Sequence, residues 1–279
     1  MKTNVKISVV MGVFNPQDSG RFIRAVDSII QQSFSEWELI LYDDGSAAES
    51  AKTIRKAAER DQRILLLRGE KNRGLAFALN ECIRHAAGGY IARMDDDDFS
   101  KPDRFRKQYD FLQAHPQYQW VGSDIELVDQ NGVWGYQKMP EAPSKRDYLF
   151  NSPYVHPSVL FRREALERVG CYSGHKAVLQ CEDYDLFLRL QKEGMRGYNL
   201  PEPLLQYWED YESYKKRTYR RRIREMKLRY RGFRELGILN RGTFPYVVKP
   251  LLVGAIPAPV HHYIKRKIRR PKKEERARG

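Results

Sequence analysis

The sequence predicts an α/β fold, in which helices cover both faces of a mostly parallel sheet, followed by a basic helical extension at the C-terminus. Two observations predict the sheet. Apolar runs start 32, 26 and 26 residues apart, about the length of a βαβ unit, and the segments between them have helical periodicity. Charge defines the extension: residues 215–279 hold 22 Lys or Arg and 4 Asp or Glu, whereas residues 1–214 hold 28 and 32.

The four apolar runs are predicted to be the first strands of the sheet. Their near-continuous apolar character suits strands that are covered on both faces, as in a parallel sheet. Because such sheets bind ligands beyond the carboxyl ends of their strands, the residues that follow each run are candidate site residues. The runs are Val5–Phe14, Trp37–Tyr42, Arg63–Leu67 and Gly89–Met94.

Helices are predicted between and after these runs. Asp18 and Ser19 form a capping signal before the first helix, which places Phe22 and Val26 on one apolar stripe. Later elements are a helix after Asn72-Arg73-Gly74, a helix after Pro102, a hairpin that turns at residues 130–132, and a helix that opens at Glu182 and ends at Gly194.

Four consecutive aspartates, Asp95–Asp98, follow the fourth apolar run. Two unit charges a few ångströms apart repel by about 4 kcal/mol at an effective dielectric constant near 20, so this cluster indicates a bound cation. Side chains alternate in extended backbone, which turns Asp95 and Asp97 to one side as an oxygen pair suited to Mg²⁺ or Mn²⁺. The alternative is a solvated loop in which Asp98 or Ser100 caps the next helix.

Asp43 and Asp44 follow the second run and belong to the same predicted edge of the sheet. A carboxylate at that edge can accept hydrogen bonds from a nucleobase or a ribose hydroxyl. The alternative is that Ser46 caps the next helix. Arg73 stands where a helix N-terminus can receive a phosphate, although a simple turn explains Asn72-Arg73-Gly74 equally well.

Glu182 and Asp183 open a helix whose other face is apolar. Acidic residues in a first helical turn are favoured by the helix dipole alone. In the functional alternative, one of these carboxylates is a general base. His156, in YVHPSVLF, is either a core or turn histidine or part of a metal or phosphate region.

The remaining composition narrows the setting. Three cysteines without metal-ligand spacing indicate a reducing compartment. The apolar N-terminal run lacks a small-residue cleavage site and is predicted to be a strand rather than a signal peptide. No run reaches the ~20 apolar residues of a membrane-spanning helix.

Six motifs together resemble those of the family-2 glycosyltransferases over about residues 5–208. They are ISVVMGVFN, LYDDGS, NRGLAFALN, ARMDDDDFSKPDRFRKQ, HPSVLFRREAL and CEDYDLFLRL, in that order. The resemblance implies the GT-A fold, a Rossmann-like α/β domain, and an inverting transferase that uses a nucleotide-diphosphate sugar with Mg²⁺ or Mn²⁺. It implies a catalytic domain at residues 1–212, with a nucleotide-sugar half near 1–100 and an acceptor half near 101–212.

The resemblance also implies a role for each candidate residue. Asp183 becomes the catalytic base with Glu182 beside it, and His156 begins the strand beneath the acceptor or phosphate region. Asp97 is implied to be the direct metal ligand, paired with Asp95. The nucleotide-sugar contacts are implied at Phe14, Asn15, Asp43, Asp44, Arg73, Asp95 and Asp96.

One stretch departs from the family pattern. Many family members carry a Tyr-Arg-x-His element whose basic residues face the pyrophosphate. Here the matching stretch LLQYWEDYES places Trp208 at the Arg and Asp210 at the His. We therefore expect Arg73, Lys215 or Arg217 to supply the phosphate contacts.

Residues 213–279 are predicted to form an amphipathic extension at an anionic membrane surface. An apolar stripe on a very basic helix, next to further apolar segments, suits a membrane interface. The alternative is that the stripe packs on the catalytic domain and leaves the charges solvated. Prolines are expected to prevent one continuous helix after residue 244. The stripe consists of Tyr219, Ile223, Met226, Tyr230 and Phe233.

These features predict a metal-dependent transferase at the cytoplasmic face of the cell membrane. It would move a hexosyl or N-acetylhexosaminyl group from a UDP-sugar to a saccharide or lipid-linked acceptor in bacterial surface-polysaccharide synthesis. A nucleotidyltransferase would also use acidic metal ligands on an α/β sheet, but it would release pyrophosphate. A nucleic-acid-binding protein would explain the basic tail. However, the body is acidic and the tail aromatics follow helical spacing, so no nucleic acid is expected.

Overall fold

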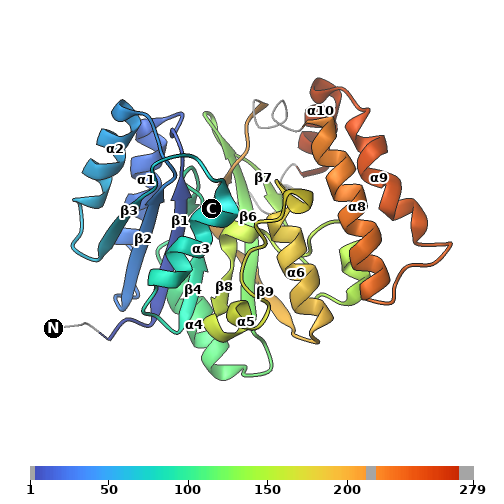
Figure 1. The fold of residues 1–279 in the computed structure, drawn as a ribbon, viewed down its shortest axis with the longest axis horizontal. Coiled ribbons are helices and arrows are strands. Elements are labelled where there is room, and N and C mark those ends of the chain that lie inside the picture. The colour runs from blue at the N-terminus through green and yellow to red at the C-terminus, as the bar shows by residue number, and fades with distance from the viewer. Residues whose placement is uncertain (1–3, 212–217, 270–279) are drawn as a thin grey trace.

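A mixed sheet of nine strands runs through the residues that the computed structural model describes, 4–211 and 218–269 (Figure 1). The strands are β1 (Ile7–Val13), β2 (Trp37–Asp43), β3 (Ile64–Arg68), β4 (Tyr90–Arg93), β5 (Phe99–Ser100), β6 (Trp120–Asp129), β7 (Gly132–Gln137), β8 (Leu160–Arg162) and β9 (Gly197–Trp208). Their order is β3-β2-β1-β4-β8-β6-β9-β5, and β7 pairs with β6.

The first four strands are the four apolar runs of the sequence, and they pair in parallel as predicted. The second half makes the sheet mixed, because β8 runs antiparallel to both β4 and β6, whereas β9 runs parallel to β6. The predicted hairpin is confirmed as β6 and β7, joined by a turn in which Gly132 has a φ of +98°.

Helices cover both faces of the sheet, as predicted. Successive residues of β1 point to opposite faces, so Val9 packs with Phe22 of α1 on one side and Val10 with Leu79 of α3 on the other. The apolar contacts place α1, α2 and α4 on the first face and α3, α5 and α6 on the second. The helices are α1 (Ser19–Ile30), α2 (Ala48–Ala58), α3 (Leu75–His85), α4 (Arg104–Ala114), α5 (Arg163–Arg168) and α6 (Glu182–Lys192).

The capping predictions have mixed outcomes. Asp18 caps α1 as expected, because its Oδ1 accepts the backbone N–H of Arg21 at 2.9 Å. Ser46 is not the cap of α2, which begins after Ala47 without a side-chain cap. The expected capping of the next helix by Asp98 or Ser100 is also wrong, since Asp103 occupies the N-cap position of α4.

The extension forms three helices at the end of the molecule opposite α1 and α2 (Figure 1). They are α8 (Tyr219–Glu235), α9 (Phe244–Gly254) and α10 (Ala258–Arg269). The break between α9 and α10 falls at Pro257 as expected, although α9 accommodates Pro250 in its interior. Within the described ranges, no helix combines the length and apolar content needed to cross a bilayer.

Helix α8 packs on the catalytic domain, which was the alternative to a membrane-bound stripe. It does so with only part of the predicted stripe, because Met226 and Phe233 pack inward whereas Tyr219, Ile223 and Tyr230 are exposed. Gly232 lies against α6, where an added Cβ would be 2.6 Å from Leu188 Cδ1. The buried residues of α8 are Leu228, Arg229, Gly232 and Phe233.

Candidate active site

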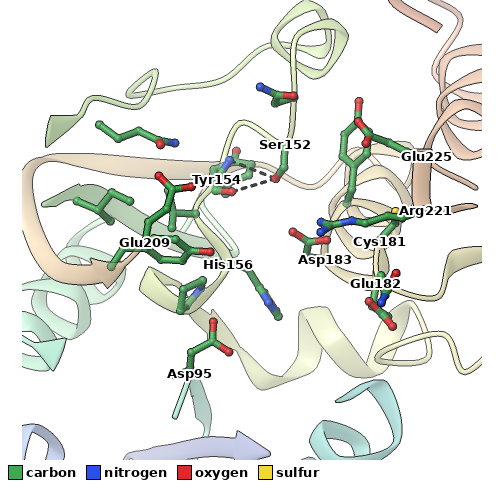
Figure 2. Close-up of a pocket in the computed structure, with 18 of the residues that line it drawn as sticks. Asp95, Ser152, Tyr154, His156, Cys181, Glu182, Asp183, Glu209, Arg221 and Glu225 are labelled. Carbon is green, nitrogen blue, oxygen red and sulfur yellow. Dashed lines mark hydrogen bonds between the residues drawn. The ribbon is translucent and has the colours of Figure 1, made fainter. Parts of the chain in front are cut away.

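A cavity of about 600 Å³ opens between the catalytic domain and the extension. Asp95 lines it just beyond β4, His156 from the 3₁₀ turn before β8, and Asp183 from the first turn of α6. Figure 2 shows these three side chains around the cavity, with Arg221 of α8 beside Asp183. The edge of the sheet and the extension therefore build one site together.

Asp95 is paired with a buried arginine that the sequence reasoning missed. Arg93 Nη2 donates to Asp95 Oδ1 at 2.5 Å, whereas Nε and Nη1 of Arg93 have no hydrogen-bond partner among the described residues. Arg104 is also buried and donates to the carbonyl of Arg93 at 2.8 Å, which fixes the end of β4. A charged residue inside the apolar run 89–94 was the signal that could have revealed Arg93.

The acidic run does not stay extended, so the predicted alternation of its side chains is wrong. Asp96 and Asp97 form a turn. As a result, Asp95 lines the large cavity, whereas Asp96 and Asp97 line a smaller pocket. Asp98 is buried and accepts the backbone N–H of Trp208 at 2.8 Å, which ties the turn to β9.

Burial and mutual repulsion raise the pKa values of two carboxyl groups in the acidic run. Burial, followed by the charges of Asp97 and Asp95, raises the pKa of Asp96 to about 7. The same causes raise the pKa of Asp98 well above its ordinary value. Among the described residues, no three His, Cys, Asp or Glu side chains form a cluster that could hold a metal ion. Exposed carboxylate oxygens within a repulsive cluster nevertheless fit a hard cation such as Mg²⁺ or Mn²⁺, to which substrate phosphates add ligands.

The smaller pocket, of about 190 Å³, lies between the end of β1 and the acidic turn. Phe14 and Asn15 line it, and the Phe14 ring is half exposed. Asn15 takes a left-handed backbone conformation with φ +46°, and its N–H donates to Ser46 Oγ at 2.9 Å. Ser46 thus joins the loops after β1 and β2 rather than capping α2.

Arg21 and Trp208 complete this pocket, and Arg21 was not predicted. The guanidinium of Arg21 stacks on the Trp208 ring, 3.5 Å from its centroid, and both residues line the pocket. Arg73 instead lies over the Phe77 ring at 3.6 Å. The tryptophan that replaces the family arginine therefore holds a cation supplied by α1. The other residues expected to contact phosphate, Lys215 and Arg217, lie outside the described residues.

Asp43 and Asp44 hold loops together beneath the sheet edge. Both are almost fully buried. Asp43 accepts the Ser46 N–H at 2.8 Å, and Asp44 accepts the N–H groups of Arg73 and Gly74 at 2.7 to 3.0 Å. Neither residue lines the large cavity or the smaller pocket, so the structure does not bring these two together with the acidic turn in one pocket.

Asp183 lines the large cavity from the first turn of α6, as does the neighbouring Glu182. Burial raises the pKa of Asp183, whereas the Tyr184 backbone N–H and the Arg221 charge lower it. Burial also raises the pKa of the neighbouring Glu182. A cavity-lining carboxylate whose pKa is shifted upward is typical of a general base.

His156 is a neutral, buried member of the cavity wall. Burial, and then the charge of Arg93, holds its pKa well below the ordinary value. Its Nε2 lies 2.7 Å from the hydroxyl oxygen of Tyr172, which itself is buried. The histidine therefore combines both predicted alternatives, since it is a core histidine that also lines the site.

The strand order, the acidic turn after β4 and the separate carboxylate at the start of α6 define a glycosyltransferase of the GT-A type. The family model described as glycosyl transferase family 2 matches residues 8–170, more than half of the chain. The protein therefore belongs to glycosyl transferase family 2 and is an enzyme of that class, as the motifs predicted.

Relatives match from 66% to 96% of the chain. A putative glycosyltransferase EpsE of Bacillus subtilis (strain 168) is 36% identical over 270 residues, covering 96% of each chain. The O-antigen biosynthesis glycosyltransferase WbnJ of Escherichia coli is 34% identical over 66% of this chain and 72% of its own. An Escherichia coli UDP-Gal:alpha-D-GlcNAc-diphosphoundecaprenol beta-1,3-galactosyltransferase is 28% identical over 94% of this chain and 96% of its own.

Solved structures confirm the fold. S. aureus TarS 1-349 in complex with UDP superposes with a TM-score of 0.65 at 18% identity, covering 98% of this chain and 77% of that one. Mannosyltransferase PcManGT from Pyrobaculum calidifontis, in complex with GDP-Man and Mn²⁺, has a TM-score of 0.61 at 17% identity, covering 96% and 81%. At these identities the likeness concerns the fold alone.

Proposed function

We propose that this glycosyltransferase inverts the configuration of a sugar as it moves it from a nucleoside-diphosphate donor to a hydroxyl group. The observation that carries this proposal is the separation of two acidic features. Asp96 and Asp97 line the small pocket with Phe14 and Asn15, whereas Asp183 lines the large cavity from the first turn of α6, next to Glu182. An inverting transfer needs one general base and no enzyme nucleophile, which matches a carboxylate that lies outside the small pocket.

Asp183 is proposed to hold the proton during transfer. Its carboxylate accepts the proton of the acceptor hydroxyl as that oxygen attacks the anomeric carbon from the face opposite the leaving group. The bond from the anomeric carbon to the diphosphate oxygen breaks in the same step, and its electron pair stays with the nucleoside diphosphate. The nearby Arg221 charge lowers the pKa of Asp183 and so favours the ionised form, which is the form that accepts a proton.

The small pocket is proposed to bind the donor. Phe14 and Asn15 would face the base, and Arg21, stacked on Trp208, would contact the diphosphate. A Mg²⁺ or Mn²⁺ ion bound by Asp97 with Asp95 would offset the negative charge that grows on the leaving diphosphate. Asp43 and Asp44 would support this side by holding the loop before α3 in place.

Relatives and neighbours support a finer assignment of substrates. One relative is named for UDP-Gal and a diphosphoundecaprenol acceptor, and another for O-antigen biosynthesis. One structural neighbour contains UDP, and another contains GDP-Man with Mn²⁺. We therefore assign a UDP-hexose or UDP-N-acetylhexosamine donor and a saccharide or lipid-linked acceptor in bacterial surface-polysaccharide synthesis. The enzyme would work at the cytoplasmic face of the membrane.

A panel of nucleotide sugars tests this function. Each sugar is incubated with the full-length protein and either Mn²⁺ or Mg²⁺, and the released nucleotide is identified by chromatography. The proposal predicts metal-dependent release of a nucleoside diphosphate from one donor class. Release of pyrophosphate from a sugar phosphate and a nucleoside triphosphate would instead identify a nucleotidyltransferase. With an accepted saccharide, NMR of the product should show an anomeric configuration opposite to that of the donor.

A further inference from the structure

The two walls of the large cavity carry opposite charges. The wall from the catalytic domain holds four carboxylates, of Asp95, Glu182, Asp183 and Glu209, and one arginine, Arg93. Within the described residues, the wall from the extension holds one carboxylate, Glu225, and six cationic side chains. The charge asymmetry of the sequence is thus reproduced inside the site. The cationic side chains are those of Arg221, Arg222, Arg229, Lys249, Lys265 and Arg269.

Two of these cations are not neutralised by a carboxylate of the wall. The Nε atom of Arg221 is buried without a hydrogen-bond partner in the described part of the chain. Lys249 Nζ donates to the carbonyl oxygen of Phe150 at 3.0 Å, and burial followed by the charge of Arg229 lowers its pKa. By contrast, Glu225 pairs with Arg222 and Arg229 at 3.2 and 3.0 Å. Lys265 pairs with Glu209 of the facing wall at 2.7 Å, and the extension wall still holds more cations than carboxylates.

Helix α10 is amphipathic, but its basic side chains face the protein and its apolar side chains face outward, the opposite of a helix that packs on a soluble domain. His261, Lys265 and Arg269, four residues apart, face the cavity. The apolar side chains at the neighbouring positions Val260, Ile264 and Ile268 are 47%, 41% and 75% exposed. A helix that served only to cover the domain would turn its apolar stripe inward. The outward stripe instead suits insertion into a membrane interface, with the basic stripe directed at the site.

We propose that the extension wall binds the diphosphate of a lipid-linked acceptor, with Arg221 and Lys249 as its principal ligands. This inference rests on the proposed function, because it places the acceptor hydroxyl at Asp183. In a polyprenyl-diphosphate saccharide, one sugar ring separates that hydroxyl from the diphosphate. Arg221 lies beside Asp183 (Figure 2), and Lys249 lines the same cavity. Guanidinium and ammonium groups are natural phosphate ligands, and the lipid would leave the cavity toward the apolar stripe of α10.

Calorimetric binding of geranyl diphosphate tests the inference without requiring transfer. The full-length protein is titrated with geranyl diphosphate, geraniol or inorganic pyrophosphate, each with excess UDP and Mn²⁺ present to occupy the donor pocket. The comparison uses Lys249→Gln, Arg221→Gln and the matched control Lys227→Gln, whose side chain is exposed on α8. Loss of one charge-assisted hydrogen bond should weaken binding of geranyl diphosphate about tenfold in the first two variants. The control should bind like the wild type.

The outcomes separate this inference from the proposed function. If Lys249→Gln and Arg221→Gln bind geranyl diphosphate as tightly as Lys227→Gln does, the site is not on the extension wall. If pyrophosphate binds as tightly as geranyl diphosphate, the wall recognises free phosphate rather than a lipid, and the inference is also overturned. Donor hydrolysis is scored independently with nucleotide sugars, so an active enzyme without geranyl diphosphate binding refutes this inference alone.

Discussion

The first half of the catalytic domain, residues 1–100, and the extension use their charged residues in opposite ways. In the first half, the carboxylates of Asp43 and Asp44 at the end of β2 accept hydrogen bonds from backbone N–H groups, and these bonds hold neighbouring loops together. In the extension, cations line the cavity while apolar side chains of α10 face outward. Polar residues at the ends of the first strands thus hold the loops in place. The cations that line the large cavity instead come from the extension, which lies outside the family motifs.

The two regions also meet in different ways. The loops of the first half are joined by hydrogen bonds to backbone N–H groups, whereas α8 is joined to α6 and to residues 149–150 by arginine side chains as well as by apolar packing. Asp185 accepts from Arg189 of its own helix and pairs with Arg231 of α8. The buried Arg229 donates to the carbonyl groups of Leu149 and Phe150. These contacts help to fix the position of the basic wall.

The largest effect is expected from removing the proposed base. Asp183→Asn keeps the shape of the side chain but cannot accept the hydroxyl proton, so kcat should fall by a factor of about 10² to 10⁴. Because Asp183 lies outside the donor pocket, the affinity for the donor nucleotide should stay within twofold, measured by calorimetry. Glu182→Gln is the matched control and should lose far less activity. Transfer by Asp183→Asn near the wild-type rate would show that another group is the base.

Breaking the joint between the two regions should have the next largest effect. Arg229→Met removes the buried guanidinium that contacts Glu225 and the carbonyl groups of residues 149–150. Because Glu225 keeps Arg222 and Phe150 keeps Lys249, the free energy of unfolding should fall by about 1 to 3 kcal/mol. Urea denaturation measures the change. Lys227→Met, two residues away on the exposed side of α8, should stay within about 0.5 kcal/mol of the wild type. Equal stability of the two variants would mean that α8 is not fastened through Arg229.

The outward stripe of α10 predicts a smaller, membrane-specific effect. Ile268→Glu removes a side chain that would insert into the interface, so binding to vesicles that contain anionic phosphatidylglycerol should weaken about tenfold in sedimentation. The protein should remain folded, because Ile268 is 75% exposed. Leu65→Glu, at an exposed apolar position of β3, is the matched control on the first half of the catalytic domain. If both variants sediment with vesicles like the wild type, the extension does not dock on membranes by this stripe.

The smallest predicted effect is a shift in pH dependence. A general base works only when ionised, so kcat/KM should fall as the pH drops through the pKa of Asp183. The charge of Arg221 lowers that pKa, and its removal should raise it. In Arg221→Gln the acidic limb of the pH–rate profile should therefore move to higher pH. Arg220→Gln, whose side chain is exposed, should leave the limb in place, and an unmoved limb in Arg221→Gln would separate Arg221 from the base.

The sequence predicted the elements that depend on local patterns. The apolar runs gave β1 to β4 because period and composition suffice for buried parallel strands, and the capping signal at Asp18 gave the start of α1. The acidic run was located correctly, but its side-chain directions were not, because a turn at Asp96 and Asp97 replaced the assumed strand.

The features that sequence reasoning missed arise from contacts between distant segments. Arg21 enters the small pocket only because it stacks on Trp208, far along the chain. The packing stripe of α8 differs from its most regular apolar stripe because Gly232 and the buried Arg229 can approach α6 and residues 149–150 closely. Which face of a helix is buried depends on the shape of the surface that it packs against. The periodicity of the helix sequence alone does not contain this information.

The glycine on α8 has a consequence for the dimensions of the large cavity. With no side chain at Gly232, the helix backbone rests directly on Leu188, and an added methyl carbon would overlap it at 2.6 Å. The close spacing between α6 and α8 therefore depends on the absence of a side chain at Gly232. The distance between Asp183 and the basic wall depends on the same spacing. An alanine at this position would push α8 away from α6. A series of small residues at position 232 could therefore be used to vary the width of the large cavity.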